Sequence, residues 1–265
     1  MSRELRTRIL SGIVMIAVAL GALLYGDIAF WALVAVLSVT MMHEWAMMAG
    51  VPKWKWALAV GVALMLQAYS LYFDASVPVR DPGSLATEAV MIAGLSAILL
   101  AVVTFTARLG WGLLYATLPA LALLYLREQP AGLALALFTM VIVWATDIGA
   151  YFAGRTIGGP KLAPKLSPNK TWAGLIGGAV AAEIVGSLVA WQMGLPMILA
   201  SACAPLAVLA QMGDLFESWL KRISGVKDSG RILPGHGGVL DRLDGLVPVA
   251  VIMAALVAAG VLHGA

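Results

Sequence analysis

The sequence alternates between apolar runs of about 20 residues and short polar segments, and a helix of that length crosses the hydrocarbon core of a bilayer. This pattern predicts an all-α, polytopic integral membrane protein with nine transmembrane helices. The predicted spans are residues 8–26, 28–48, 56–73, 87–106, 110–126, 131–152, 172–192, 196–216 and 245–263.

The composition supports membrane insertion. Hydrophobic residues make up 62% of the 265 residues and charged residues only 12%, and the mean hydropathy is +0.94. A soluble domain does not use so much apolar sequence. The single cysteine, Cys203, lies inside an apolar run, so we expect neither an intrachain disulfide nor a cysteine metal site.

The distribution of Lys and Arg predicts the orientation of the spans. When the nine spans are threaded in turn, Arg80 and Arg127 fall on one side and the remaining fifteen of the 17 basic residues on the other. Because basic residues are enriched in cytoplasmic loops, we predict a cytoplasmic N-terminus and a C-terminus outside. The large polar loops 153–171 and 214–244 are then both cytoplasmic.

Charged side chains are concentrated in the segment 214–244. Its first part has the spacing of one helical face, which would carry carboxylates, a hydroxyl and cations together. The residues on this face are Asp214, Glu217, Ser218, Lys221 and Arg222.

The second part of the segment is rich in glycine between residues 225 and 238, and such a backbone can bring N–H groups close to an anion. Asp241 and Asp244 follow, three residues apart, and we expect them on one helical face. Mg²⁺ prefers carboxylate and phosphate oxygens as ligands, and Lys or Arg can neutralise the remaining phosphate charge. The segment therefore predicts a metal and polyphosphate site, whereas a solvated basic loop would explain the cations but not the acids.

This segment resembles the signature of the phosphatidate cytidylyltransferase family, also called the CDP-diacylglycerol synthase family. The matching positions are Ser218, Lys221, Arg222, Lys227, Asp228, Pro234, His236, Gly237, Gly238, Asp241, Arg242 and Asp244.

A second group of polar residues, upstream, is also similar to the family. It consists of Asp147 with Ala150 and Tyr151, followed by a proline-rich lysine loop with Ser167, Pro168, Lys170, Thr171 and Gly174. A carboxylate within or at the edge of a membrane span is costly and is a candidate for function. Alternatively, Asp147 only caps the helix or pairs with Arg155.

The resemblance implies the reaction of CTP with phosphatidic acid to give CDP-diacylglycerol and pyrophosphate. It implies Mg²⁺, with a second, monovalent cation such as K⁺. Asp214 and Asp241 are the predicted metal ligands and catalytic acids, with Asp244 as a further ligand, and Lys221, Arg222 and His236 complete the catalytic set. The predicted substrate-binding residues are Lys170, Thr171, Ser167, Ser218, Lys227, Asp228, Arg242, Asp147 and Tyr151.

The resemblance is strong in residues 131–265, which we predict to be the catalytic membrane region, whereas residues 1–130 match only as generic N-terminal membrane helices. We expect a homodimer embedded among the lipids of a bacterial-type cytoplasmic (inner) membrane, with the active site on the cytoplasmic side. No nucleic-acid partner is expected.

Two other functions remain open from the sequence. A CTP-dependent lipid-alcohol kinase of the dolichol or phytol type would use similar loops but would transfer the γ-phosphate. A membrane transporter would explain many spans but predicts inverted repeats, which this sequence does not show.

Two acids inside predicted spans have no assigned role. Glu44 ends the second span, where it could reach water or touch the site, and Glu183 could line a cavity or bind a neighbouring helix. Next to Glu44, Trp45 is predicted to join Trp54 and Trp56 in an interfacial aromatic belt.

Overall fold

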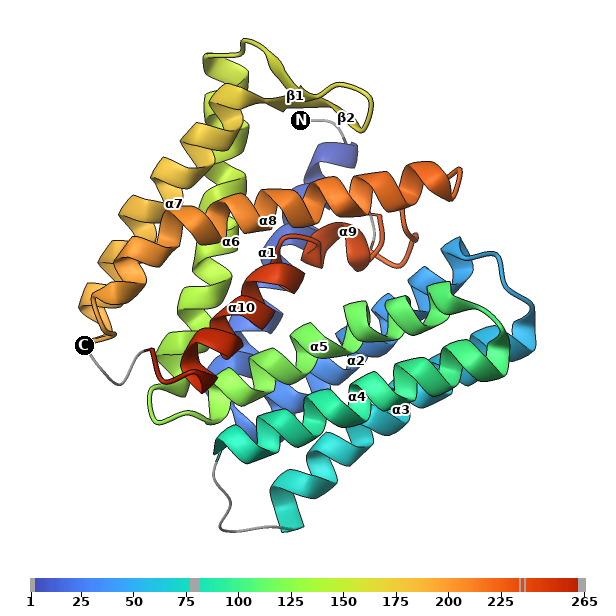
Figure 1. Ribbon diagram of the computed structural model, residues 1–265. Coiled ribbons are helices and arrows are strands. Elements are labelled where there is room, and N and C mark those ends of the chain that lie inside the picture. The colour runs from blue at the N-terminus through green and yellow to red at the C-terminus, as the bar shows by residue number, and fades with distance from the viewer. Residues whose placement is uncertain (1–2, 77–81, 234, 236, 262–265) are drawn as a thin grey trace. The chain divides into compact units, whose positions relative to one another are not determined.

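The computed structural model of the protein is mostly helical and describes residues 3–76, 82–233, 235 and 237–261 (Figure 1). A helix lies at each predicted span. In order, the elements are α1 (Arg3–Tyr25), α2 (Asp27–Met48), α3 (Lys53–Ser76), α4 (Pro82–Thr104), α5 (Ala107–Glu128), α6 (Gly132–Thr156), β1 (Lys161–Ala163), β2 (Ser167–Thr171), α7 (Trp172–Gln192), α8 (Ile198–Ile223), α9 (Leu240–Leu243) and α10 (Leu246–Ala258).

Six helices within the described ranges are long and apolar enough to cross a membrane, which makes the chain an integral membrane protein. They are Asp27–Met48, Thr87–Thr104, Ala107–Glu128, Gly132–Thr156, Trp172–Gln192 and Ile198–Ile223. By contrast, α10 has 13 residues, roughly 20 Å of helix against a hydrocarbon core of about 30 Å. Nine crossings and the orientation of the termini stay predictions.

The chain divides into two compact units. Unit 1 comprises Met1–Tyr125 and Ser224–Arg242, and unit 2 comprises Leu126–Ile223 and Leu243–Ala265. The glycine-rich segment therefore belongs to the same unit as the first five helices. The predicted boundary near residue 130, between generic membrane helices and the catalytic region, concerns function rather than compactness and stays a prediction.

Unit 1 is held together partly by polar contacts buried between its helices. The Ser38 hydroxyl in α2 donates to the backbone carbonyl of Ala116 in α5 (2.9 Å) and accepts from the Gln67 amide of α3 (3.1 Å). The Trp45 indole N–H donates to the carbonyl of Arg108 (2.7 Å), and this side chain is buried. The prediction that Trp45 belongs to an interfacial belt is therefore wrong, because Trp45 packs against α5.

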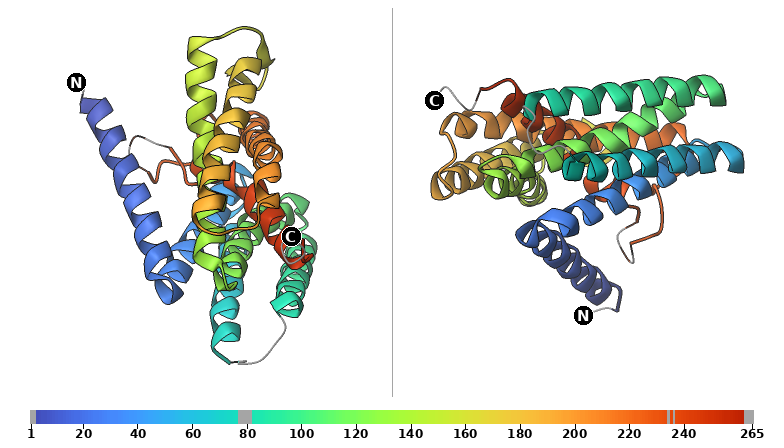
Figure 2. Two further views of the ribbon diagram at one scale, coloured as in Figure 1. Left: turned by 90° about the vertical axis from the view of Figure 1, so that its left-hand side faces the viewer. Right: turned by 90° about the horizontal axis from the view of Figure 1, so that it is seen from below.

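Unit 2 is built around α6 and α7, which lie side by side (Figures 1 and 2). Small residues allow this approach: a Cβ added at Gly149 would lie 2.7 Å from the carbonyl oxygen of Gly177. Helix α8 packs against α7, and α10 packs against α8 and α6. Glu183 of α7 accepts a hydrogen bond from the N–H of Ala204 in α8 (3.2 Å), so it binds a neighbouring helix.

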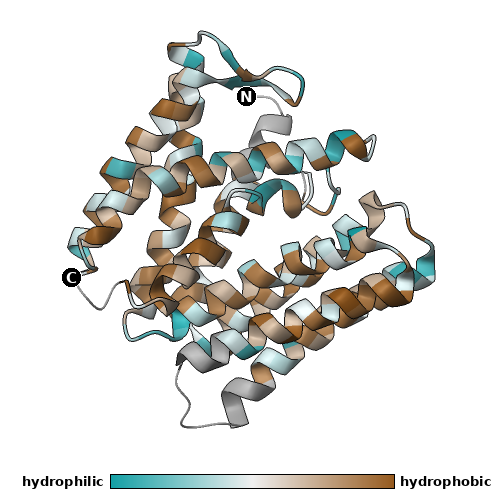
Figure 3. Cartoon of the chain, in the orientation of Figure 1, coloured by the Kyte–Doolittle hydropathy of each residue, from teal (hydrophilic) through white to brown (hydrophobic). Residues whose placement is uncertain are grey.

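A two-stranded antiparallel sheet joins α6 to α7 and is an addition to the predicted all-α fold. In its register Lys161 pairs with Thr171, and Ala163 pairs with Ser167. The sequence predicted a proline-rich lysine loop here, and the backbone pairing between the two strands was not anticipated. Figure 3 shows hydrophilic residues gathered at this hairpin and at the C-terminal end of α8.

The close approach of α6 and α7 generates a stability prediction. A Cβ at Gly177 would overlap the side chain of Ala153, whereas a Cβ at Gly94 in α4 would meet nothing within 4 Å. We expect Gly177→Ala to lower the free energy of unfolding by about 1–3 kcal/mol through overpacking. Gly94→Ala should leave it unchanged or raise it by up to about 1 kcal/mol through helix propensity. Thermal unfolding of both variants in detergent measures the difference, and equal melting temperatures would contradict this packing.

Candidate active site

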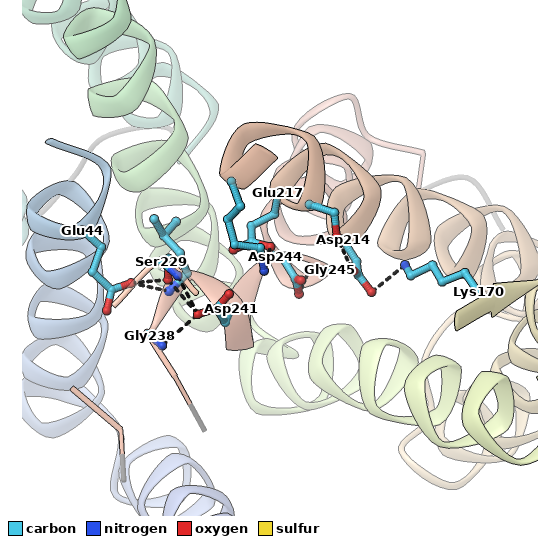
Figure 4. Close-up of polar contacts among 12 residues, drawn as sticks. Glu44, Lys170, Asp214, Glu217, Ser229, Gly238, Asp241, Asp244 and Gly245 are labelled. Atoms are coloured by element: carbon cyan, nitrogen blue, oxygen red, sulfur yellow. Dashed lines mark hydrogen bonds and ion pairs between the residues drawn. The ribbon is translucent and has the colours of Figure 1, made fainter. Parts of the chain in front are cut away.

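Glu44, near the end of α2, is buried and accepts three hydrogen bonds from the glycine-rich segment of unit 1 (Figure 4). Its Oε1 accepts from the N–H of Val239 (2.9 Å). Its Oε2 accepts from the N–H of Leu240 and from the hydroxyl of Ser229, both at 2.9 Å. The side chain is only 1% exposed. Burial destabilises a carboxylate that has no hydrogen-bond donors, so these three donors stabilise Glu44 at its buried position.

Asp241, on α9, is held by the same segment. Its Oδ2 accepts from the N–H of Ser229 (3.0 Å), from the Ser229 hydroxyl (3.0 Å) and from the N–H of Gly238 (2.8 Å). The Ser229 hydroxyl has a single hydrogen, and it lies within bonding distance of both Glu44 and Asp241. The two acids are thus joined through one serine.

The glycines of this segment are required by the two carboxylates. A Cβ at Gly230 would overlap the carboxylate of Glu44, and one at Gly238 would overlap the hydroxyl of Ser229. Gly237 has a φ of +83°, and a Cβ there would lie 2.8 Å from the Oδ2 of Asp241. The segment does bring N–H groups to an anion, as predicted, but the anions in the described structure belong to the protein itself.

Four charged residues of the segment lie at the surface of unit 1. Lys227, Asp228, Arg231 and Arg242 are all exposed. His236, predicted to be catalytic, and Pro234 lie outside the described residues. Two of these residues, Lys227 and Arg242, are predicted substrate-binding cations.

A second group of acids lies in unit 2 and centres on Asp214 of α8 (Figure 4). Asp214 forms an ion pair with Lys170 of β2, with Nζ and Oδ2 2.5 Å apart. The Ser218 hydroxyl, one helical turn further on, is 3.4 Å from the Oδ1 of Asp214. Lys170 also approaches the carbonyl of Gln211 (3.4 Å), so the hairpin brings its lysine onto α8.

Asp244 belongs to the same acid cluster. The spacing predicted that Asp244 shares a helical face with Asp241, and this prediction is wrong. Helix α9 ends at Leu243, and Asp244 lies in the turn before α10. Burial, and then the charge of Asp214, raise the pKa of Asp244 to about 8. Asp147 raises it further, while the N–H of Gly245 and the charge of Lys170 lower it. The N–H of Gly245 donates to its Oδ1 (2.7 Å).

The predicted helical face of segment 214–222 is confirmed, because α8 continues to Ile223. On this face the buried Glu217 forms an ion pair with Lys221, 2.5 Å between Oε2 and Nζ. Lys221, predicted to be catalytic, is thus held by a carboxylate one turn away. Arg222 is exposed.

Two other predicted residues have structural roles in the hairpin. Thr171 is buried, and its hydroxyl oxygen accepts from the N–H of Gly174 (3.0 Å), which caps α7. Ser167 is half-buried at the start of β2. N-capping accounts for a threonine at this position without a ligand.

Arg155, which the sequence offered as a partner of Asp147, contacts Tyr151 in the structure. The Nη1 of Arg155 donates to the hydroxyl of Tyr151 (2.6 Å), and its guanidinium carbon lies 5.9 Å from the centre of that ring. Asp147 is exposed on α6, and its charge acts on Asp244. The structure therefore brings Asp147, Asp214, Asp244 and Lys170 into one electrostatic cluster of unit 2.

The residue that sequence reasoning undervalued is Glu44. Its position at a helix end favoured contact with water over a role in the site, and its partners are 185–196 residues away. The only signal in the sequence is an acid within an apolar span, which is costly unless it is used.

The acids of unit 2 offer the carboxylate oxygens that Mg²⁺ prefers as ligands. In the parts of the chain that the structure describes, no three His, Cys, Asp or Glu side chains form a metal cage. Mg²⁺ does not need one, because it is usually held by one or two carboxylates, waters and substrate phosphates. Three acids act together in unit 2 against the charge of Lys170, and a divalent cation would offset that excess.

The raised pKa of Asp244 yields a pH prediction. The folded chain favours the neutral carboxyl, so its stability should fall as the pH rises through the range up to about 8. In Asp244→Asn the acceptor for Gly245 is kept and the charge cannot form. Without divalent cations, we expect this variant to melt roughly 2–6 °C above the unsubstituted protein at pH 9 and close to it at pH 5. A difference in melting temperature that is independent of pH would contradict this.

Comparisons with known proteins show the family to which the chain belongs. The family model described as the cytidylyltransferase family matches residues 6–259. The protein named phosphatidate cytidylyltransferase from Brucella suis biovar 1 is 40% identical over 268 residues, which cover 94% of this chain and 92% of that protein. The protein of the same name from Pseudomonas aeruginosa is 36% identical and covers 95% of this chain and 96% of its own length. The chain belongs to the cytidylyltransferase family.

Proposed function

We propose that this protein is a phosphatidate cytidylyltransferase, which transfers the cytidylyl group of CTP to phosphatidic acid and releases pyrophosphate. The observation that carries the proposal is the family match over residues 6–259, together with 40% identity to a protein named phosphatidate cytidylyltransferase over 94% of this chain.

In the proposed reaction, a phosphate oxygen of phosphatidic acid attacks the α-phosphorus of CTP. A new P–O bond forms, the bond from the α-phosphorus to the β-bridging oxygen breaks, and pyrophosphate leaves with that electron pair. The attacking phosphate is already an anion, so the protein does not need a strong general base. Its main task is to position two anions and to offset their charge.

Cations of both units can perform this task. In unit 1 the N–H groups of Ser229, Gly238, Val239 and Leu240 are engaged by Glu44 and Asp241. Phosphate binding by this segment therefore falls to its exposed side chains, of which Lys227, Arg231 and Arg242 are cationic. In unit 2, Lys170 and Lys221 are each held next to a carboxylate.

We propose that Asp214 and Asp241 each supply a carboxylate ligand to Mg²⁺, with Asp244 as a further ligand and a monovalent cation such as K⁺ at a second position. When bound, Mg²⁺ would neutralise charge on the triphosphate and on the departing pyrophosphate. What supports the assignment is the oxygen chemistry of the acids and the accumulation of negative charge around Asp244. We also propose that the protein forms a homodimer in a bacterial inner membrane, with its active site on the cytoplasmic side.

The products of the reaction test the proposed function. Purified protein is supplied with phosphatidic acid, a long-chain lipid alcohol, Mg²⁺ and CTP labelled at either the α- or the γ-phosphate. The α-label should enter the lipid, and the γ-label should appear in pyrophosphate in equal amount. If the γ-label enters the lipid and CDP accumulates, the protein is a CTP-dependent kinase and the proposal is wrong.

The two acids are tested by Asp214→Asn and Asp241→Asn. We expect each change to lower kcat/KM by roughly 100-fold or more, because charge stabilisation at the phosphates is lost. The matched control is Asp27→Asn, which removes an exposed acid at the start of α2, where a φ of 40° suits asparagine. Activity of either site variant within threefold of this control would remove that residue from the site.

A further inference from the structure

We propose that Glu44 is a positioning residue of the active site, which fixes the segment 224–242 so that Asp241 is held in one orientation. The inference rests on the proposed function, because it assigns the metal-binding role to Asp241. It concerns a buried acid of α2 that none of the family-like motifs includes.

The first argument is the fit between the carboxylate and its donors. Both oxygens of Glu44 are used, and the backbone N–H groups of Val239 and Leu240 reach one oxygen each at 2.9 Å. Only a carboxylate offers two acceptor oxygens in this geometry. A glutamine has one acceptor, and its NH₂ group would face a backbone N–H. The site is therefore built for an acid at this position.

The second argument is the connection to Asp241. The Ser229 hydroxyl lies 2.9 Å from Glu44 and 3.0 Å from Asp241, and the Ser229 N–H also donates to Asp241. Any shift of Ser229 changes the contacts of both acids. Glu44 thus acts on Asp241 through a single residue, in the way that hydrogen-bond partners orient a metal ligand.

The third argument is the absence of space for an alternative arrangement. Gly230 and Gly238 place their backbones directly against Glu44, where any larger residue would collide with it. Within the segment, the apolar residues Val239 and Leu240 are buried, whereas residues 225–228, 231 and 232 are exposed. The conformation between Ser229 and Gly238 therefore depends on the carboxylate of α2, in addition to the burial of Val239 and Leu240.

A purely structural role would give a different outcome from a positioning role. If Glu44 only contributes to stability, its loss lowers the melting temperature without changing how the remaining folded protein binds Mg²⁺. If it positions Asp241, the segment becomes mobile and the Mg²⁺ concentration for half-maximal activity rises, while the rest of the chain stays folded.

The experiment compares Glu44→Gln and Ser229→Ala with the control Ser38→Ala. Ser38 is buried on the same helix and also loses hydrogen bonds, but its partners are Ala116 and Gln67, away from the segment. Amide hydrogen exchange of the full-length protein without metal or nucleotide is measured for peptides of 224–242 and of 198–223. Glutamine keeps the size of Glu44, and Ser229→Ala provides a second route if that variant folds poorly.

We expect Glu44→Gln to increase exchange in 224–242 by at least 10-fold and to leave 198–223 unchanged. Its kcat/KM should fall by about 10–100-fold and the half-saturating Mg²⁺ concentration should rise. Ser229→Ala should change both readouts in the same direction, and Ser38→Ala should change neither. Unaltered exchange in 224–242, or a lower melting temperature with unchanged Mg²⁺ dependence, would overturn the inference. If the unsubstituted protein makes no CDP-diacylglycerol, the proposed function fails, and the exchange data still decide whether Glu44 holds the segment.

Discussion

The structure depends on one constraint: a carboxylate that is buried in an apolar protein must find its donors inside the protein. Glu44 is 1% exposed and meets this demand with two backbone N–H groups and one hydroxyl, all from a single segment. A chain that is 62% hydrophobic has few other polar groups to offer. The same requirement that makes Glu44 costly therefore holds the glycine-rich segment against α2.

The acids of unit 2 present the opposite situation. The raised pKa of Asp244 reflects burial and the negative charges of Asp214 and Asp147. Such a cluster lowers stability when the protein stands alone, and functional sites commonly carry this kind of cost. Cations and substrate phosphates would relieve it. Glu44 thus has its hydrogen-bond donors within the protein, whereas the negative charge around Asp244 would be offset by a bound cation.

Sequence reasoning predicted the helices well, because long apolar runs have few alternative structures, and it predicted the acidic and basic face of α8 from helical spacing. It missed contacts that local pattern does not encode. The hairpin depends on the pairing of Lys161 with Thr171, and Trp45 is buried because Gly112 leaves room for it. The glycines near Asp241 were attributed to ligand binding. Their positions are explained by contacts with Glu44, which lies far away in the sequence.

The central claim is that Glu44 and Ser229 act as one unit, and a double-mutant cycle measures this directly. The free energy of unfolding is determined in detergent for the unsubstituted protein, for Glu44→Gln, for Ser229→Ala and for the double variant. We predict a coupling energy of about 1–3 kcal/mol, because each residue loses its partner when the other is changed. If the losses of unfolding free energy in the two single variants sum to that of the double variant within about 0.3 kcal/mol, the two side chains act independently. That result would contradict the account.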